Sequence, residues 1–370
     1  MLEKVYQLFY PNSFTGRQLP DEIIVDIFGR LPAECIVRCG HACKPLHALM
    51  RSPAFVYKHL NRATPVIAFS YHWKSYWEEV RVHFTDDLVR TISLKSVPLE
   101  KYYLPVLFCS YNGFLLLRGS KEVIIWNPIS EQLVRVTLPL GSCLCGFFIY
   151  PQTMEYRIIH QSRESNYFKF FVYGLMSKES KKITFSHPPT TEKAPILLHG
   201  VLHWMVSDDA YQIVHGVQPD CSNSIVLFNI NSEDFYTTPH PGVQCGLKKK
   251  HGKMELIEME GHLCFCDSSS NENVVIWILE DYEDMIWRKR FIVMMESLME
   301  FCGIQWRYGY NVNVGGFQIY NKELLVRVSK NDIILYDLQT GVCRRVGNRV
   351  KNDSHVVAVP HINSLVLDID

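Results

Sequence analysis

The sequence lacks the net positive charge that would attract a polyanion such as nucleic acid. Its 38 basic and 38 acidic side chains cancel over 370 residues. Nucleic-acid-binding proteins usually carry a clustered excess of Lys and Arg that neutralises phosphates. The balance therefore disfavours nucleic acid as a partner. An RNA-binding alternative stays open, because residues 248–253 contain four lysines, Lys248, Lys249, Lys250 and Lys253, that could contact phosphates or serve as a nuclear-localisation signal.

Long apolar runs are also missing. No segment approaches the roughly 18 consecutive apolar residues that a transmembrane helix needs. Residues 1–7 contain an acidic side chain and lack the apolar stretch of a secretion signal. The longest apolar runs, such as 123–126 and 225–228, have the length of strands. We therefore expect a soluble protein without a membrane partner, located in the cytoplasm, the nucleus or both.

The usual motifs of metal binding and catalysis are absent as well. Cys143 and Cys145, and likewise Cys264 and Cys266, would place two thiols on one face of a strand, but no second pair follows at a zinc-finger spacing. In a reducing compartment the 12 cysteines are expected to be buried thiols. The sequence contains no phosphate-binding loop, no nucleophile elbow and no His-Glu-x-x-His motif. It thus predicts no cofactor, no metal site and no catalytic residue.

Residues 18–62 carry the periodicity of short helices. Pro20 followed by two acidic residues indicates a helix start. Ile23, Ile27 and Leu31 then recur every four residues, which gives an amphipathic helix with one apolar stripe. Pro32 ends this helix, because the residue before a proline avoids the α conformation. A second helix is expected within 33–43 and a third from 45 to about 52. Three such helices can barely bury enough apolar surface alone, which is compatible with a small helical cap on the main domain or with a docking module whose apolar stripe packs on a partner helix.

The same segment closely resembles an F-box. Residues 19–32 are similar to the opening of that motif, 38–44 to its middle and 52–63 to its end. The resemblance implies binding to a Skp adaptor and, through it, to the cullin scaffold of a ubiquitin ligase. The residues to which it assigns adaptor binding lie in the first helix and in the flanking Leu-Pro pairs: Leu19, Pro20, Ile23, Ile24, Ile27, Leu31 and Pro32. Two departures are Leu46, where many members have Trp, and Gly29 late in the first helix.

From residue 65 onward, helical periodicity gives way to short β-branched and aromatic runs separated by turn residues. One unit recurs: an apolar strand ending in an aromatic residue, a polar turn, and a second strand. The six aromatic residues are Phe84, Trp126, Tyr173, Phe228, Trp277 and Tyr336. Their separations of 42, 47, 55, 49 and 59 residues are typical of propeller blades, which are four-stranded sheets of about 40–50 residues. The sequence therefore predicts a β-propeller-like domain of six blades.

Two kinds of turn accompany these strands. Asn127, Asn229 and Asp337 follow three of the aromatic residues, and their side chains are expected to hydrogen-bond the backbone of the turn. A polar residue and Gly precede other apolar strands, and Asn321-Lys322 is a glycine-free version of that turn. The chain also stays apolar over 354–367, which predicts that the last strands close the ring by pairing with the first blade.

This second region resembles the F-box-associated domain of plant F-box proteins, a relative of kelch and galactose-oxidase-like propellers. The resemblance rests on Trp126-Asn127-Pro128, on 199–204 and on 359–366. The predicted fold is thus mainly β, with a three-helix F-box before the propeller. Its predicted parts are an N-terminal extension (1–17), an F-box (18–62) and an F-box-associated propeller (65–370).

Together the two resemblances imply a non-catalytic substrate receptor, which recruits an unidentified target protein to the ligase. Loops on one propeller face would select the target, and the longest are expected around 208–223, 244–255 and 296–313. The competing hypothesis is a metal-dependent enzyme of the galactose-oxidase kind, with copper held by Tyr and His side chains. The sequence has 15 His and 19 Tyr that could supply such ligands, but the histidines are scattered, and His199, His203 and His262 fall within strand patterns typical of polar strand residues.

Overall fold

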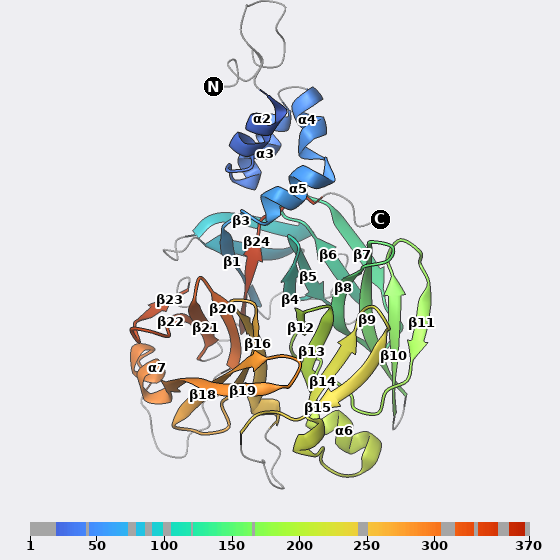
Figure 1. Cartoon of the computed structure of the whole chain (residues 1–370), viewed down its shortest axis with the longest axis vertical. Coiled ribbons are helices and arrows are strands. Elements are labelled where there is room, and N and C mark those ends of the chain that lie inside the picture. Colours follow the sequence, from blue (N-terminus) through green and yellow to red (C-terminus); the bar gives the residue numbers. More distant parts are fainter. Residues whose placement is uncertain are drawn as a thin grey trace, which may run out of the picture.

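Strands from both ends of the propeller sequence meet in one sheet and close a ring of six blades (Figure 1). The computed structural model describes residues 20–41, 44–72, 79–85, 91–98, 105–119, 121–164, 167–242, 251–304, 315–328, 332–346 and 355–366. Each blade in these ranges is an antiparallel sheet of four strands. The prediction of a mainly β protein with a six-bladed propeller is confirmed.

The blades are numbered in chain order. The strands of each blade are given from the inner strand outward. Blade 1 contains β24 (His355–Ile362), β1 (Pro65–His72), β2 (Glu79–Thr85) and β3 (Thr91–Pro98). Blade 2 contains β4 (Val106–Tyr111), β5 (Phe114–Arg118), β6 (Glu122–Trp126) and β7 (Leu133–Thr137). Blade 3 contains β8 (Ser142–Tyr150), β9 (Glu155–Glu164), β10 (Tyr167–Gly174) and β11 (Ser180–Ile183).

The other three blades repeat this order. Blade 4 contains β12 (Ile196–Leu198), β13 (Val201–Met205), β14 (Ile225–Asn229) and β15 (Asp234–Thr238). Blade 5 contains β16 (Met254–Met259), β17 (His262–Asp267), β18 (Asn273–Asp281) and β19 (Ile286–Met294). Blade 6 contains β20 (Gly315–Tyr320), β21 (Glu323–Arg327), β22 (Ile333–Asp337) and β23 (Cys343–Arg345).

Ring closure occurs in blade 1, where the last strand of the chain becomes the inner strand. β24 pairs antiparallel with β1 along its full length, from Pro65 opposite Ile362 to His72 opposite His355. Tyr320 of blade 6 adds a hydrogen bond from its hydroxyl to the Pro65 carbonyl oxygen at 3.1 Å. The predicted pairing of the last strands with the first blade is therefore confirmed.

All six aromatic residues used to count blades lie in the third strand of successive blades, from Phe84 in β2 to Tyr336 in β22. The predicted turns follow them. Asn127 Oδ1 accepts hydrogen bonds from the backbone amides two and three residues later. Asn229 and Asp337 do the same in blades 4 and 6. These side chains cap the turn amides, which explains why an Asn or Asp follows the aromatic residue in these three blades.

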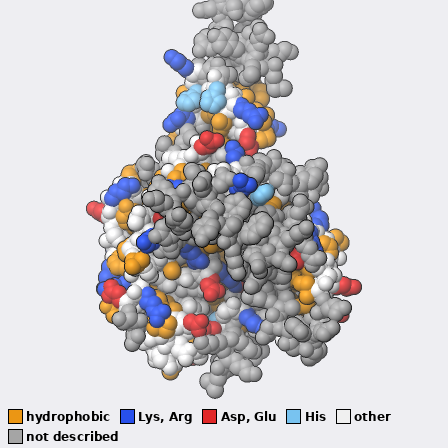
Figure 2. Space-filling model, turned by 180° about the vertical axis from the view of Figure 1, so that it is seen from behind, with side chains coloured by type: hydrophobic (Ala, Val, Ile, Leu, Met, Phe, Trp, Pro, Cys, Tyr) orange, Lys and Arg blue, Asp and Glu red, His pale blue; other side chains and the backbone are white. Residues whose placement is uncertain are grey.

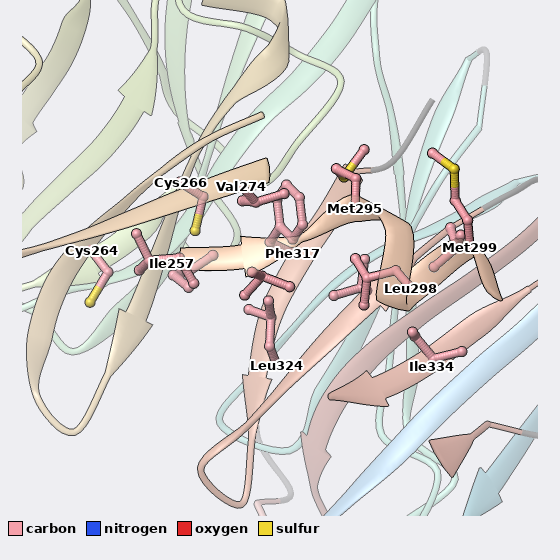
Figure 3. Packing of buried hydrophobic residues seen from close by; sticks show 14 of the residues in the cluster. Ile257, Cys264, Cys266, Val274, Met295, Leu298, Met299, Phe317, Leu324 and Ile334 are labelled. Carbon is pink, nitrogen blue, oxygen red and sulfur yellow. The ribbon is translucent and has the colours of Figure 1, made fainter. Parts of the chain in front are cut away.

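The apolar core lies between neighbouring blades. Figure 3 shows the cluster between blades 5 and 6, where Phe317 and Leu324 of blade 6 face Cys264 and Cys266 of blade 5. Both thiols are fully buried, and burial raises the pKa of Cys264 to about 12. The two thiols share one face of β17, as predicted, and no described cysteine forms a disulfide. Blade-to-blade packing thus supplies the core that one blade alone would lack.

The N-terminal helices form a separate layer above the ring (Figure 1). They are α2 (Asp21–Phe28), α3 (Ala33–Gly40), α4 (Lys44–Met50) and α5 (Pro53–Leu60), and residues 20–62 are called the helical module below. The structure thus differs from the predicted three helices, because Ser52-Pro53 ends one helix and starts another. Ser52 Oγ accepts from the Phe55 amide at 3.4 Å, and Pro53 occupies the first turn of α5. Among the described helices, none is both long enough and apolar enough to span a bilayer.

Candidate functional site

The first turns of the helical module leave an apolar stripe exposed. Ile23 and Ile27 lie one helical turn apart on α2, with 45% and 49% of their surface exposed. Ile24 and Phe28, on the opposite side of the helix, are buried against the other helices. Contact between water and two adjacent isoleucine side chains is unfavourable, and a partner that covers them would remove it. The Ile23–Ile27 stripe is therefore a candidate docking surface.

The other residues assigned to adaptor binding hold different positions. Pro20 and Pro32 are exposed and immediately precede α2 and α3. Leu31 is half-buried, and its carbonyl oxygen accepts a hydrogen bond from His59 Nε2 at 2.9 Å. Leu19 lies outside the described residues. The structure therefore brings five of the seven predicted residues to or near the surface of the module and places Ile24 in its core.

Polar contacts fix the exposed helix α2 against the end of α5. Asp26 accepts hydrogen bonds from Arg62 at 2.8 Å and from Arg30 at 2.7 Å, and these cations hold the pKa of Asp26 below its usual value. Gly29, which departs from the F-box pattern, is buried next to this network. A Cβ at Gly29 would lie 2.8 Å from the Val25 carbonyl oxygen, so this close approach excludes a side chain. Leu46, the other departure, is fully buried.

The helical module shares its apolar core with the ring. Ile129, in the turn between β6 and β7, and Leu365, just after β24, belong to the same buried cluster as Ile24 and Leu46. Asn363 Nδ2 also donates to Glu34 Oε1 of α3 at 2.9 Å. The module therefore packs on residues from the propeller.

Asn127 joins these propeller residues to one another. Its side chain is fully buried, and Nδ2 donates to the carbonyl oxygens of Ser364 at 3.1 Å and Val366 at 2.8 Å. Its Oδ1 accepts from the Ile129 amide at 2.8 Å. Sequence reasoning predicted the turn hydrogen bond but missed the bonds to the C-terminal segment, because no local pattern reveals a partner more than 200 residues away.

The propeller has two faces, and successive connections between strands lie on opposite faces. Connections between first and second strands, and between third and fourth strands, lie on the face that contacts the helical module, called the proximal face here. Connections between second and third strands, and between successive blades, lie on the distal face. The described parts of the three predicted target-binding loops all belong to the distal face, where they include α6 (Asp208–His215) and α7 (Met295–Phe301). In Figure 1, α6 lies at the end of the molecule opposite the helical module.

A pocket of about 290 Å³ opens on this distal side of blade 3. It lies between β10, β11 and α6, and aromatic rings form much of its wall. The lining includes Phe168, Phe170, Phe185, Pro188 and Val214. A pocket of this size and composition can accept an apolar side chain of a protein partner.

The three histidines that fall within predicted strand patterns lie in or beside strands. His203 is buried, and its Nδ1 donates to the Ile196 carbonyl oxygen at 3.0 Å while Nε2 bonds the Tyr282 hydroxyl at 2.7 Å. Burial lowers the pKa of His203 to about 4, so the ring is neutral at pH 7. His199 lies in the turn before β13, and His262 is exposed at the start of β17. Both ring nitrogens of His203 thus have hydrogen-bond partners, which gives this histidine a structural role.

Of the basic run proposed for RNA binding, Lys248, Lys249 and Lys250 lie outside the described residues, and Lys253 is exposed just before β16. On the face shown in Figure 2, basic and acidic side chains of the described residues are interspersed. Surface ion pairs of this kind include Arg135 with Glu122 at 3.1 Å and Arg288 with Glu280 at 2.8 Å. Charges of both signs therefore lie close together among the described residues of that face.

Comparison with known families matches both regions of the chain. The family described as "F-box associated beta propeller domain" matches residues 70–365, which include all six blades except the first few residues of β1. The family described as "F-box-like" matches residues 17–63, which include the helical module.

Individual relatives share this arrangement at low identity. F-box protein CPR1 from Arabidopsis thaliana is 22% identical, covering 87% of this chain and 82% of the relative. A second F-box protein from the same plant is 24% identical over 75% of this chain and 71% of the relative. A solved structure of a Bacteroides caccae protein of unknown function aligns with a TM-score of 0.46 at 11% identity, covering 80% of this chain and 99% of that chain. Both sequence relatives cover most of this chain.

Proposed function

Because this chain belongs to the F-box-associated β-propeller family, we propose that it is the substrate-receptor subunit of a Skp–cullin–F-box ubiquitin ligase. In this role the helical module binds a Skp-type adaptor, and the propeller recruits a target protein for ubiquitination and proteasomal degradation. The observation that carries the proposal is the exposed Ile23–Ile27 stripe on a module that matches the F-box-like family.

Docking on the adaptor uses the side of the module that the ring leaves uncovered. Ile129 and Leu365 cover the inner side of the module, whereas Ile23, Ile27 and Pro20 point away from the core. A partner helix laid across this stripe would bury two isoleucine side chains, each worth about 1.5–3 kcal/mol when fully buried. The predicted contact is therefore an apolar helix-on-helix interface.

The target binds on the distal face in this proposal. The connection that carries α6 lies there, and Val214 of α6 lines the pocket together with Phe168 and Phe185. The proximal and distal faces point in opposite directions, so a bound target does not compete with the adaptor for space. The chain contributes proximity rather than chemistry, because holding a target lysine near the charged ubiquitin enzyme raises its effective concentration.

The proposal also covers the type of propeller and the location of the protein in the cell. The propeller is related to the kelch and galactose-oxidase-like type in architecture but acts as a non-catalytic receptor. We place the protein in the cytoplasm, the nucleus or both, where the ligase works. Imaging a fluorescent fusion of the full chain tests this location, and a membrane-bound or secreted signal would contradict it.

The decisive experiment replaces Ile27 by Asp. A carboxylate in the middle of an apolar contact costs several kcal/mol, so adaptor affinity should fall more than about 100-fold. Because Ile27 is half-exposed in the free chain, the thermal unfolding of the variant should stay close to that of the wild type. Binding of the full chain to purified adaptor is measured by biolayer interferometry.

The matched control is Met176→Asp, which changes an apolar side chain that is 58% exposed on the propeller. This variant should bind the adaptor normally. If Ile27→Asp and Met176→Asp both bind the adaptor like the wild type, α2 is not the docking surface and the receptor assignment fails.

A further inference from the structure

Three potential metal ligands from separate segments converge on the distal face between blades 4 and 5. Cys221 lies in η2 (Cys221–Asn223), within the connection from β13 to β14. His240 lies two residues after β15, and His251 begins η3 (His251–Lys253) just before β16. One donor atom from each of the three lies within 4.8 Å of the others. From this geometry we propose that Cys221, His240 and His251 bind a zinc ion.

The hydrogen bonds around the two histidines select the nitrogen that would bind the metal. Asp208 Oδ1 accepts from His251 Nδ1 at 2.7 Å, and the Pro241 carbonyl oxygen accepts from His240 Nδ1 at 2.7 Å. A carbonyl oxygen can only accept, so His240 carries its proton on Nδ1 and presents a lone pair on Nε2. The carboxylate imposes the same tautomer on His251. A carboxylate–histidine pair of this kind is the usual outer support of a zinc ligand.

The surroundings hold the three segments in place. Ser224 is fully buried, and its hydroxyl donates to the Cys221 carbonyl oxygen at 2.8 Å and accepts from the His240 amide at 3.0 Å. The His240 ring stacks on Phe265 with a centroid distance of 5.3 Å and an interplanar angle of 2°. His240 and His251 are 8% and 4% exposed. One serine thus ties two ligand segments together, and the rings have little room to rotate away.

The donor set favours zinc. One thiolate and two imidazoles match the ligands of tetrahedral zinc sites, at about 2.3 Å for sulfur and about 2.0–2.1 Å for nitrogen. Those bond lengths place the donor atoms roughly 3.4–3.6 Å apart. The present limit of 4.8 Å therefore requires the donor atoms to move together by at most about 1.2–1.4 Å. Water completes the tetrahedron as the fourth ligand. Without zinc, the Cys221 thiol and His251 hydrogen-bond each other, which keeps both side chains in position.

The zinc ion would join the connection that carries α6 to the entry of blade 5. Both segments belong to the loops assigned to target binding, so zinc would fix the shape of that part of the distal face. The site itself does not depend on the proposed function, since metal binding and adaptor binding are measured separately and lie on opposite faces.

Zinc content is measured on the purified full chain after removal of metal with a chelator and incubation with zinc. Elemental mass spectrometry should then find one zinc ion per protein chain. The variants Cys221→Ser, His240→Gln and His251→Gln should each lose at least 100-fold in affinity in competition with a chromophoric chelator. Asp208→Ala should weaken binding about 10–100-fold, because it removes only the support of His251. The control Cys343→Ser, which changes a half-buried thiol in blade 6, should bind normally.

Cobalt substitution of the wild-type chain makes the test independent of how well the variants fold. The expected spectrum has a thiolate-to-cobalt charge-transfer band and the intense visible bands of tetrahedral cobalt(II). A wild-type chain that takes up no zinc would overturn the proposal. So would zinc retained by the Cys221→Ser, His251→Gln double variant, or a cobalt spectrum without the thiolate band.

Discussion

The helical module and the ring bury their apolar residues in different ways. Each blade covers its neighbours, so the ring completes its own core once β24 closes blade 1. The helical module has too few residues for this and completes its core with Ile129 and Leu365 from the ring, while Ile23 and Ile27 stay exposed. The difference shows that the small domain depends on the large one for packing and keeps an apolar side for a partner.

Removing residues 354–370 should have the largest effect on both regions. The deletion leaves the β1 edge of blade 1 unpaired and takes Leu365 from the core of the helical module. An open apolar edge favours aggregation, so size-exclusion chromatography should show little soluble monomer. Removing only residues 367–370 is the control and should leave a monomer. A monomeric longer deletion with an unchanged unfolding transition would show that closure is dispensable.

Asn127→Leu should weaken the link between the two regions without removing a strand. The change leaves the Ser364 and Val366 carbonyl oxygens and the Ile129 amide without their partner. Burying such groups unpaired lowers the free energy of unfolding by about 2–4 kcal/mol, measured by urea titration. Asn229→Leu is the matched control, because it removes the same turn hydrogen bonds at a half-exposed site in blade 4. Equal losses in both variants would mean that the bonds to the C-terminal segment add nothing.

The closing strand should also make stability depend on pH through His361. This histidine is 1% exposed, lies 2.9 Å from Ser110 Oγ, and has its pKa lowered by burial from 6.5 to about 3. The unfolded chain therefore takes up this proton first, and the contribution of His361 to stability is lost as pH falls below 6.5. Between pH 6.5 and pH 5 the loss is about 2 kcal/mol. His361→Leu should reduce the decline in urea stability over this range by that amount, and an unchanged decline would exclude His361 as its source.

The smallest effect on stability is expected from a substitution of Lys322, which changes the ring alone. This residue has a left-handed backbone (φ 69°) in the turn between β20 and β21, where the equivalent turn of blade 5 has Gly261. Lys322→Gly should raise the free energy of unfolding by about 0.5–1 kcal/mol. Its ion pair with Glu260 is largely exposed and worth little. Lys322→Ala keeps the backbone strain and removes the ion pair, so a gain in this control would contradict the backbone explanation.

The propeller could be predicted because its signals are local. The aromatic residue in each third strand, and the Asn or Asp that follows it in three of the blades, act within a few residues, so they repeat visibly along the chain. The four helices of the module were harder to count. Ser52-Pro53 was interpreted as a helix end, whereas the serine also caps the next helix. A proline signal alone does not distinguish these two uses.

The contacts that join the regions could not be predicted, because they depend on distant partners. Ile129 has the apolar pattern of any turn residue, and only the folded chain shows it against Ile24 and Leu46. The same limit applies to the proposed zinc ligands. Cys221, His240 and His251 are separated by 19 and 11 residues, which matches no recognised ligand spacing. They come together only because the β13–β14 and β15–β16 connections lie next to each other on the distal face.

Ring closure by β24 has a consequence for synthesis of the protein. The ribosome completes the helical module by residue 62, but Leu365, which finishes its core, follows about 300 residues later. At typical translation rates of about 5–20 residues per second, the module waits roughly 15–60 s for that residue. During this interval the nascent chain has neither a closed ring nor a completed module. A receptor interrupted before its last strand therefore cannot present the helices in their final arrangement, which couples ligase assembly to completion of the whole chain.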